Sequence, residues 1–259
     1  MGLSVYVRAW RAGIVAFGLA MFGPAGLRAE PSAPAVLVEP SAEPFGLAAT
    51  SLSAGGLHDK WLGVQRRLDD DMVQLALCEG DRDGCVSPAA LRFLDIVDAA
   101  RLRDGRARLG EINRTFNLSI KATSDLAQHG EVDVWSSPLA TLERGGGDCE
   151  DYAIAKFVAL RRAGLAPDDL RIVVMHDTLR DEDHAVAAAR LDGRWLMLDN
   201  RRMAMIADAD IRNYRPTFVI GPYGVMRYAD PSLLADASDR KPVASLAADL
   251  LIGTANGSF

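Results

Sequence analysis

The sequence is short of basic residues and of long apolar runs. It has 29 Lys and Arg against 35 Asp and Glu in 259 residues, which gives a net charge of −6. Nucleic-acid binding relies on basic surface to contact phosphates, so we expect no nucleic-acid partner. No stretch after residue 29 is long and apolar enough to span a membrane, so we expect no span in the mature chain. A hydrophobic content of 49% still allows a real core.

The first 29 residues, Met1–Ala29, resemble a secretory signal peptide. Arg8 and Arg11 form a charged start, and Ala12–Phe22 is an apolar run that is short for a membrane anchor. Small residues follow and offer a cleavage site near Ala29. Because this leader holds three arginines and no acidic residue, its removal would lower the net charge from −6 to −9. We therefore expect an exported, acidic protein.

Cysteine is also scarce, with three residues in the whole chain. Cys78 and Cys85 lie close together around a GDRDG loop, and in an exported protein we expect them to form a disulfide. Cys149 is then left as a single free thiol. Such a thiol is a liability in an oxidising compartment unless it is buried or used.

Cys149 lies in the most informative stretch of the chain, GGGDCEDYAIAKFVALRRAG at Gly145–Gly164. The stretch predicts a glycine loop that runs into a helix, with Asp148 as the N-cap and Gly164 at the C′ position. Cys149 would then be the first helical residue, where the helix dipole and free N–H groups favour the thiolate. Thiolate is a nucleophile, so the pattern indicates covalent catalysis. The alternative is that Cys149 is a small buried hydrophobic residue, as most free cysteines are.

The order of predicted elements, helices first and an antiparallel meander afterwards, favours an α+β fold. We expect residues 30–56 to be a flexible or partly extended lead-in, residues 57–230 to form the domain, and residues 231–259 to be a tail. Within the domain, the residue patterns predict helices over 58–78, 87–101, 109–116, 138–144 and 149–163, a loop over 117–129, and strands over 170–175, 184–191, 194–200 and 217–221.

A two-residue turn at Asp192–Gly193 predicts a hairpin that brings two chemically useful side chains together. With this turn, Asp199 is opposite Val186, and His184 lies two residues away on the same face. Diagonal neighbours on one face are about 7–8 Å apart by Cα, within reach of a His–carboxylate hydrogen bond. Asp199 could orient His184, and His184 could take the proton of the thiol. His176, at the end of the preceding strand, is the main rival base.

These residues resemble the bacterial transglutaminase-like cysteine protease family. The resemblance rests on GDCEDYAIAKF, on Trp135–Pro138 before it, on HAV at His184 and on LDN at Leu198–Asn200, and it covers roughly residues 61–228. It implies a papain/transglutaminase-like fold with a catalytic triad at Cys149, His184 and Asp199. It also implies a periplasmic, calcium-dependent endopeptidase whose substrate is a surface protein such as a biofilm adhesin. A regulatory receptor in the inner membrane is a further partner that the family implies.

The calcium dependence implied by the family has a physical counterpart in this sequence. Asp148, Glu150 and Asp151 crowd the start of the helix around Cys149 and would oppose ionisation of the thiol by like-charge repulsion. Clustered carboxylates are preferred ligands of calcium, which would neutralise them. We therefore expect these three residues to bind calcium, although acidic residues also favour a helix N-terminus for its dipole.

The expected function is thus that of an exported cysteine endopeptidase. The Gly145–Gly147 loop would let the substrate backbone approach closely, and Trp135 is a candidate wall of the cleft or a second oxyanion donor. Two other classes stay open on the sequence alone. One is a transglutaminase-type acyltransferase, which would use the same triad, and the other is a non-enzymatic calcium-binding module on the same fold.

Overall fold

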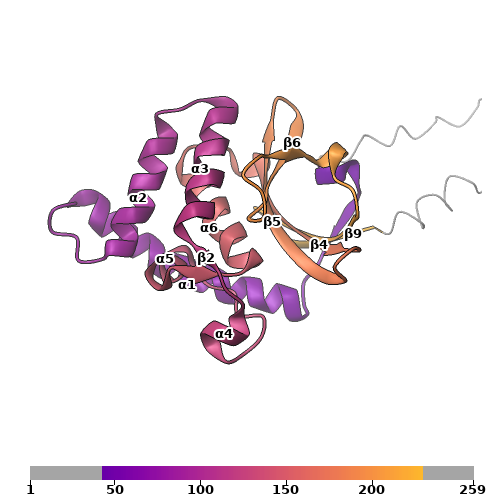
Figure 1. Cartoon of the computed structure of the whole chain (residues 1–259), viewed down its shortest axis with the longest axis horizontal. Coiled ribbons are helices and arrows are strands. Elements are labelled where there is room, and N and C mark those ends of the chain that lie inside the picture. The colour runs from indigo at the N-terminus through magenta and orange to yellow at the C-terminus, as the bar shows by residue number, and fades with distance from the viewer. Residues whose placement is uncertain (1–42, 230–259) are drawn as a thin grey trace, which may run out of the picture. The chain divides into compact units, whose positions relative to one another are not determined.

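The structure, a computed structural model, describes residues 43–229 (Figure 1). The expected signal peptide at 1–29, the first part of the lead-in and the tail at 231–259 lie outside the described residues. Within 43–229, six α-helices pack against a seven-stranded antiparallel sheet, which confirms the expected α+β class. Among the described helices, none has the length and apolar character needed to cross a membrane.

Five of the helices were expected from the sequence, and the one expected over 109–116 is longer in the structure; the described residues form six helices in all. They are α1 (Gly56–Gly80), α2 (Pro88–Arg101), α3 (Gly105–Ser119), α4 (Asp125–His129), α5 (Pro138–Arg144) and α6 (Cys149–Arg162), with short 3₁₀ turns η1 (Pro44–Gly46), η2 (Pro167–Asp169) and η3 (Asp208–Asp210). Ser87 caps α2, because its hydroxyl accepts the backbone N–H of Ala90 at 3.2 Å. Gly164 follows α6 with φ of +97°, the left-handed conformation expected at a helix C-terminus.

The expected disulfide is present between Cys78, near the end of α1, and Cys85, just before α2. It closes the GDRDG loop between the two helices. The loop over residues 117–129, by contrast, was only partly predicted correctly, because it contains α4 and the short strand β2 (Lys121–Ala122). β2 forms because it pairs in parallel with β3 (Gly146–Gly147), a long-range contact that local sequence patterns do not reveal.

The main sheet has the strand order β1-β9-β8-β4-β5-β6-β7. Its strands are β1 (Ala49–Ser51), β4 (Leu170–Asp177), β5 (Glu182–Leu191), β6 (Arg194–Leu198), β7 (Ile206–Ala207), β8 (Tyr214–Gly221) and β9 (Gly224–Tyr228). The β5–β6 hairpin turns at Asp192 and Gly193, which both have positive φ, +51° and +75°. Leu191 pairs with Arg194 and Ala187 with Leu198, so the predicted register is confirmed.

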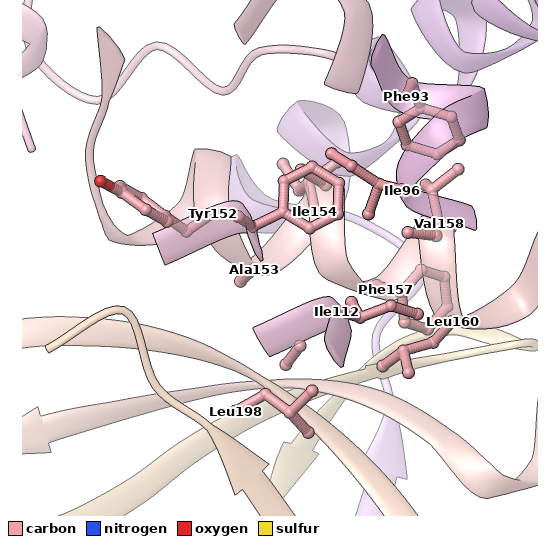
Figure 2. Packing of buried hydrophobic residues seen from close by; sticks show 14 of the residues in the cluster. Phe93, Ile96, Ile112, Tyr152, Ala153, Ile154, Phe157, Val158, Leu160 and Leu198 are labelled. Carbon is pink, nitrogen blue, oxygen red and sulfur yellow. The ribbon is translucent and has the colours of Figure 1, made fainter. Parts of the chain in front are cut away.

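Helix α6 is the centre of the main core and lies between the other helices and the sheet (Figure 1). Figure 2 shows apolar side chains of α6 meeting Phe93 and Ile96 of α2, while Leu198 of β6 rises from the sheet. Ala185, Ala187 and Ala189 of β5 belong to the same core, and their small side chains allow α6 to lie close to the sheet. This packing holds the first residue of α6 against β5.

The part of the expected lead-in that the structure describes is built into the fold. β1 pairs with β9, so that Ala49 is opposite Tyr228. Glu43 accepts two hydrogen bonds from the buried Arg171 guanidinium, at 2.6 and 2.8 Å. Phe45 meets the ring of Tyr228 edge-on and helps to cover a second apolar cluster on the face of the sheet opposite α6. Residues 43–51 therefore pack as part of the domain, with β1 as an extended segment.

Candidate active site

Cys149 is the first residue of α6 and a free thiol, as expected. Its Sγ lies 3.1 Å from Oε2 of Glu150, and the backbone N–H of Ala185 in β5 is hydrogen-bonded to the sulfur. Burial, followed by the negative charge of Glu150, raises the pKa of the Cys149 thiol. The expectation that the helix start favours the thiolate is therefore outweighed by burial and by the acidic neighbours.

His184 and Asp199 form the pair that the hairpin register predicts. Nε2 of His184 lies 2.9 Å from Oδ1 of Asp199, and the imidazole is buried. Burial alone would raise the pKa of Asp199, but the hydrogen bond and charge of His184 and the backbone N–H of Arg201 lower it, so the carboxylate is ionised. The other ring nitrogen of His184, Nδ1, is buried and has no hydrogen-bond partner within residues 43–229.

The rival base, His176, is engaged elsewhere. Its Nδ1 lies 3.2 Å from Oδ1 of Asp183, near the start of β5. Its Nε2 lies 3.2 Å from Oδ1 of Asp181, which comes just before β5. His176 pairs with Asp183 in the β4–β5 ladder, so the two side chains share one face of the sheet. His176 is not among the residues that line the cleft described next.

Cys149 and His184 line the same cleft, which has a volume of about 850 Å³. The walls come from the start of α1, from the segment around β2, from the loop before α5, from the start of α6 and from β5 with its neighbours. The other residues that line the cleft include Lys60, Thr123, Asp133, Trp135, Asp148, Glu150, Asp183, Asn200, Arg201 and Phe218. A cleft of this size can hold an extended peptide segment, since ligand pockets commonly measure about 300–1,000 Å³.

Two expected features of the cleft need different interpretations. Trp135 does line the cleft, but its indole N–H donates to Oδ1 of Asp133 at 2.9 Å, so it is not a free oxyanion donor.

Gly146 and Gly147 are buried, and their small size serves packing within the chain. A Cβ on Gly147 would lie 2.8 Å from the Cβ of Asp151. Gly147 therefore allows the close approach of Asp151, and the Gly145–Gly147 loop is not among the residues that line the cleft.

Three carboxylates converge beside Cys149. Asp125, Asp148 and Glu150 each offer an oxygen, and these atoms lie within 4.8 Å of one another. Oδ1 of Asp125 and Oδ1 of Asp148 are buried without a hydrogen-bond partner in the described part of the chain. Burial, then the negative charge of Glu150, raises the pKa of Asp148 to about 8. Asp148 was expected to cap α6, but its side chain makes no capping hydrogen bond. It faces the other acidic groups instead.

Asp151, which we expected to be the third metal ligand, lies outside this group. Its Oδ1 accepts the backbone N–H of Ser136 at 2.8 Å, and its Oδ2 lies 4.0 Å from Arg144. Burial raises its pKa to about 7. Asp125 takes its place in the cluster, and sequence reasoning missed it. The parallel pairing of β2 with β3 brings the segment before α4 beside Asp148, and only that pairing could have identified Asp125.

Comparisons with known proteins agree with this fold and these motifs. The family model of the bacterial transglutaminase-like cysteine proteinases, BTLCP, matches residues 74–215, more than half of the chain. Comparison with curated proteins finds no match.

Among solved structures, Legionella pneumophila LapG is similar, with 22% identity and a TM-score of 0.50, over 61% of this chain and 87% of that chain. Its calcium-bound form matches with the same identity and TM-score over 63% and 92% of the two chains. Its EGTA-treated form does so over 63% and 91%. The similarity to LapG shows the fold, and the family match shows the enzyme class. The chain belongs to the bacterial transglutaminase-like cysteine proteinases and is a cysteine protease.

Proposed function

We propose that this protease cleaves peptide bonds with Cys149 as nucleophile, His184 as general base and acid, and Asp199 as the group that orients His184. The observation that carries the proposal is that His184, which lines the same cleft as the free thiol of Cys149, lies 2.9 Å from Asp199. The carboxylate of Asp199 is hydrogen-bonded to Nε2 of His184. The buried Nδ1 of His184 is therefore the nitrogen that can exchange a proton with the thiol.

The reaction then follows from these groups. His184 takes the proton of Cys149, and the thiolate attacks the carbonyl carbon of the scissile peptide bond. The imidazolium gives this proton to the leaving amine, and a thioester remains on Cys149. His184 next deprotonates a water molecule, which attacks the thioester, releases the carboxylic acid and restores the thiol. The carboxylate of Asp199 stabilises the imidazolium in both steps.

The negative oxygen formed in each step needs hydrogen-bond donors. The backbone N–H of Cys149 lies in the first turn of α6, where N–H groups lack helical partners and the dipole favours negative charge. We assign it as one oxyanion donor. Because the Trp135 indole is committed to Asp133, it is not assigned as the second.

A calcium site formed by Asp125, Asp148 and Glu150 fits this arrangement. Three carboxylates within 4.8 Å, two of them with a buried oxygen that has no hydrogen-bond partner among residues 43–229, repel one another and suit a hard cation that prefers oxygen ligands. When bound, calcium would supply the positive charge that offsets the acidic groups beside the thiol. Asp125 also accepts the backbone N–H of Val134, so the same carboxylate fixes the segment that leads to the Trp135 wall of the cleft.

We further propose that the enzyme is exported to the periplasm and acts on a surface or periplasmic protein such as a biofilm adhesin, under the control of an inner-membrane receptor. Support comes from the signal-like residues 1–29 and from the family.

Proteomics of cell-surface and released proteins, comparing wild type with Cys149→Ala, tests this proposal. The expected result is one or a few surface proteins that are released only by the wild type. Identical released fractions would contradict a surface substrate. Product masses in the presence of added amine also separate hydrolysis, which we propose, from transamidation.

A further inference from the structure

Side chains of two helices, α3 and α6, donate hydrogen bonds to the backbone of the loop that contains Asp199. This loop runs from Leu198, the last residue of β6, to Met203. Asn117 of α3 donates to the carbonyl of Asp199 and to that of Arg202, each at 3.0 Å. Asn113 of the same helix donates to the carbonyls of Arg202 and Met203 at 3.2 and 3.1 Å. The main chain around Asp199 is therefore fixed by groups outside the cleft.

Lys156 of α6 completes this network. Its side chain is fully buried, and Nζ donates to the carbonyl of Leu198 at 2.9 Å and to Oδ1 of Asn113 at 2.8 Å. Nζ also lies 5.6 Å from the centre of the Tyr152 ring. Lys156 is seven residues from Cys149 on the same helix, so one rigid element connects the nucleophile to the loop of Asp199.

A lysine in this position is costly for folding alone. Burial opposes its charge and lowers its pKa to about 7, while the negative charge of Asp199 partly counteracts that shift. Removing an ammonium group from water carries a large penalty, and an apolar side chain of similar length often stabilises such a site at least as well. The energetic cost of burying Lys156 has an explanation if Lys156 positions Asp199 and stabilises its negative charge.

We infer that Lys156, together with Asn113 and Asn117, positions Asp199 against His184 by fixing the carbonyls of the loop from Leu198 to Met203. Lys156 touches neither substrate nor the reacting atoms, so it acts only through Asp199. This inference rests on the proposed orienting role of Asp199. It adds that the accuracy of the His184–Asp199 contact depends on a buried network that joins α3, α6 and the end of β6.

The test is Lys156→Met in the full chain with calcium present, which keeps the length of the side chain and removes its donors. The probe is a peptide that the wild type cleaves, selected from a random peptide library. We expect kcat to fall on the order of 100-fold, the loss typical of a small misplacement of reacting groups. KM should stay within about twofold, and the variant should stay folded at the assay temperature, with any loss of Tm too small to account for the loss of kcat. The low-field NMR resonance of the His184 Nε2 proton should also shift or disappear.

A second variant keeps the inference testable if Lys156→Met does not fold. Asn117→Ala, at a partly buried helix position, removes both hydrogen bonds to the loop and should lower kcat about 10-fold at an unchanged Tm. Leu118→Ala is the matched control, because Leu118 follows Asn117 in the same turn of α3 but is exposed. Wild-type kcat in Asn117→Ala, or a loss of activity in Lys156→Met that merely follows a fall in Tm, would overturn the inference.

Two further variants separate this inference from the proposed triad. Cys149→Ala should be inactive, and Asp199→Asn should lower kcat, whether or not the network matters. If either retains full activity, the proposed triad fails. If both behave as expected while Lys156→Met and Asn117→Ala keep wild-type kcat, only the positioning role fails.

Discussion

Replacing Asp125 by Asn should weaken calcium binding, whereas the same change at Asp151 should not. Oδ1 of Asp125 is buried and has no hydrogen-bond partner in the described chain, and the carboxylate offers an oxygen within 4.8 Å of an oxygen of Asp148 and of Glu150. A contact with a charged group contributes roughly 1.5–3 kcal/mol, and each 1.4 kcal/mol corresponds to about a tenfold change in affinity. Asp125→Asn should therefore raise the Kd for calcium about 10- to 100-fold.

The Asn variant is preferable to Ala because its amide oxygen can still accept the backbone N–H of Val134. In Asp151→Asn, the amide oxygen can still accept the N–H of Ser136, and we expect the Kd to change by less than about threefold. Isothermal titration calorimetry of chelator-treated protein with calcium measures both values, and thermal unfolding checks that both variants are folded. Weaker binding in Asp151→Asn than in Asp125→Asn would refute the ligand set and restore the one predicted from sequence.

Three other predictions follow from the same structure. The double variant Cys78→Ala, Cys85→Ala should lose roughly 2 kcal/mol of unfolding free energy, because the disulfide closes a loop with a sequence separation of 7. Its kcat should equal that of the wild type, and a stability equal to that of the wild type in urea titration would contradict the prediction. Glu43→Gln should cost about 3 kcal/mol by leaving the buried Arg171 without its carboxylate, and an unchanged urea midpoint would show that residues 43–51 are not part of the domain. His184→Ala should lower kcat roughly 10²- to 10⁴-fold, and wild-type turnover would remove it from the mechanism.

The sequence could predict those parts of the site that depend on local patterns. The two-residue turn at Asp192–Gly193 determined the register, and the register placed His184 and Asp199 on one face. The apolar spacing after Cys149 predicted α6, and the two neighbouring cysteines predicted their bond. Each of these inferences needs only residues that are close in sequence or joined by a short turn.

The sequence could not predict features that depend on distant segments. Asp125 joins Asp148 and Glu150 only because β2 pairs in parallel with β3, two-residue strands that have no periodicity to detect. Asp148 would cap α6 in isolation, but its place among other carboxylates leaves its side chain without a capping bond.

Gly147 was predicted to admit substrate, because the sequence does not show that Asp151 packs against it. Lys156 reads as an ordinary helix residue until its buried contacts with Leu198 and Asn113 are known.

The most direct test of the proposed mechanism is peptide hydrolysis by the wild type in calcium, by the wild type in excess EGTA, and by Cys149→Ala in calcium. Mass spectrometry of a random peptide library detects cleavage without knowledge of the natural substrate. We predict cleavage by the wild type in calcium alone, with Cys149→Ala folded but inactive. Cleavage by Cys149→Ala would contradict the role of Cys149 as nucleophile, and equal cleavage in EGTA would contradict the calcium site.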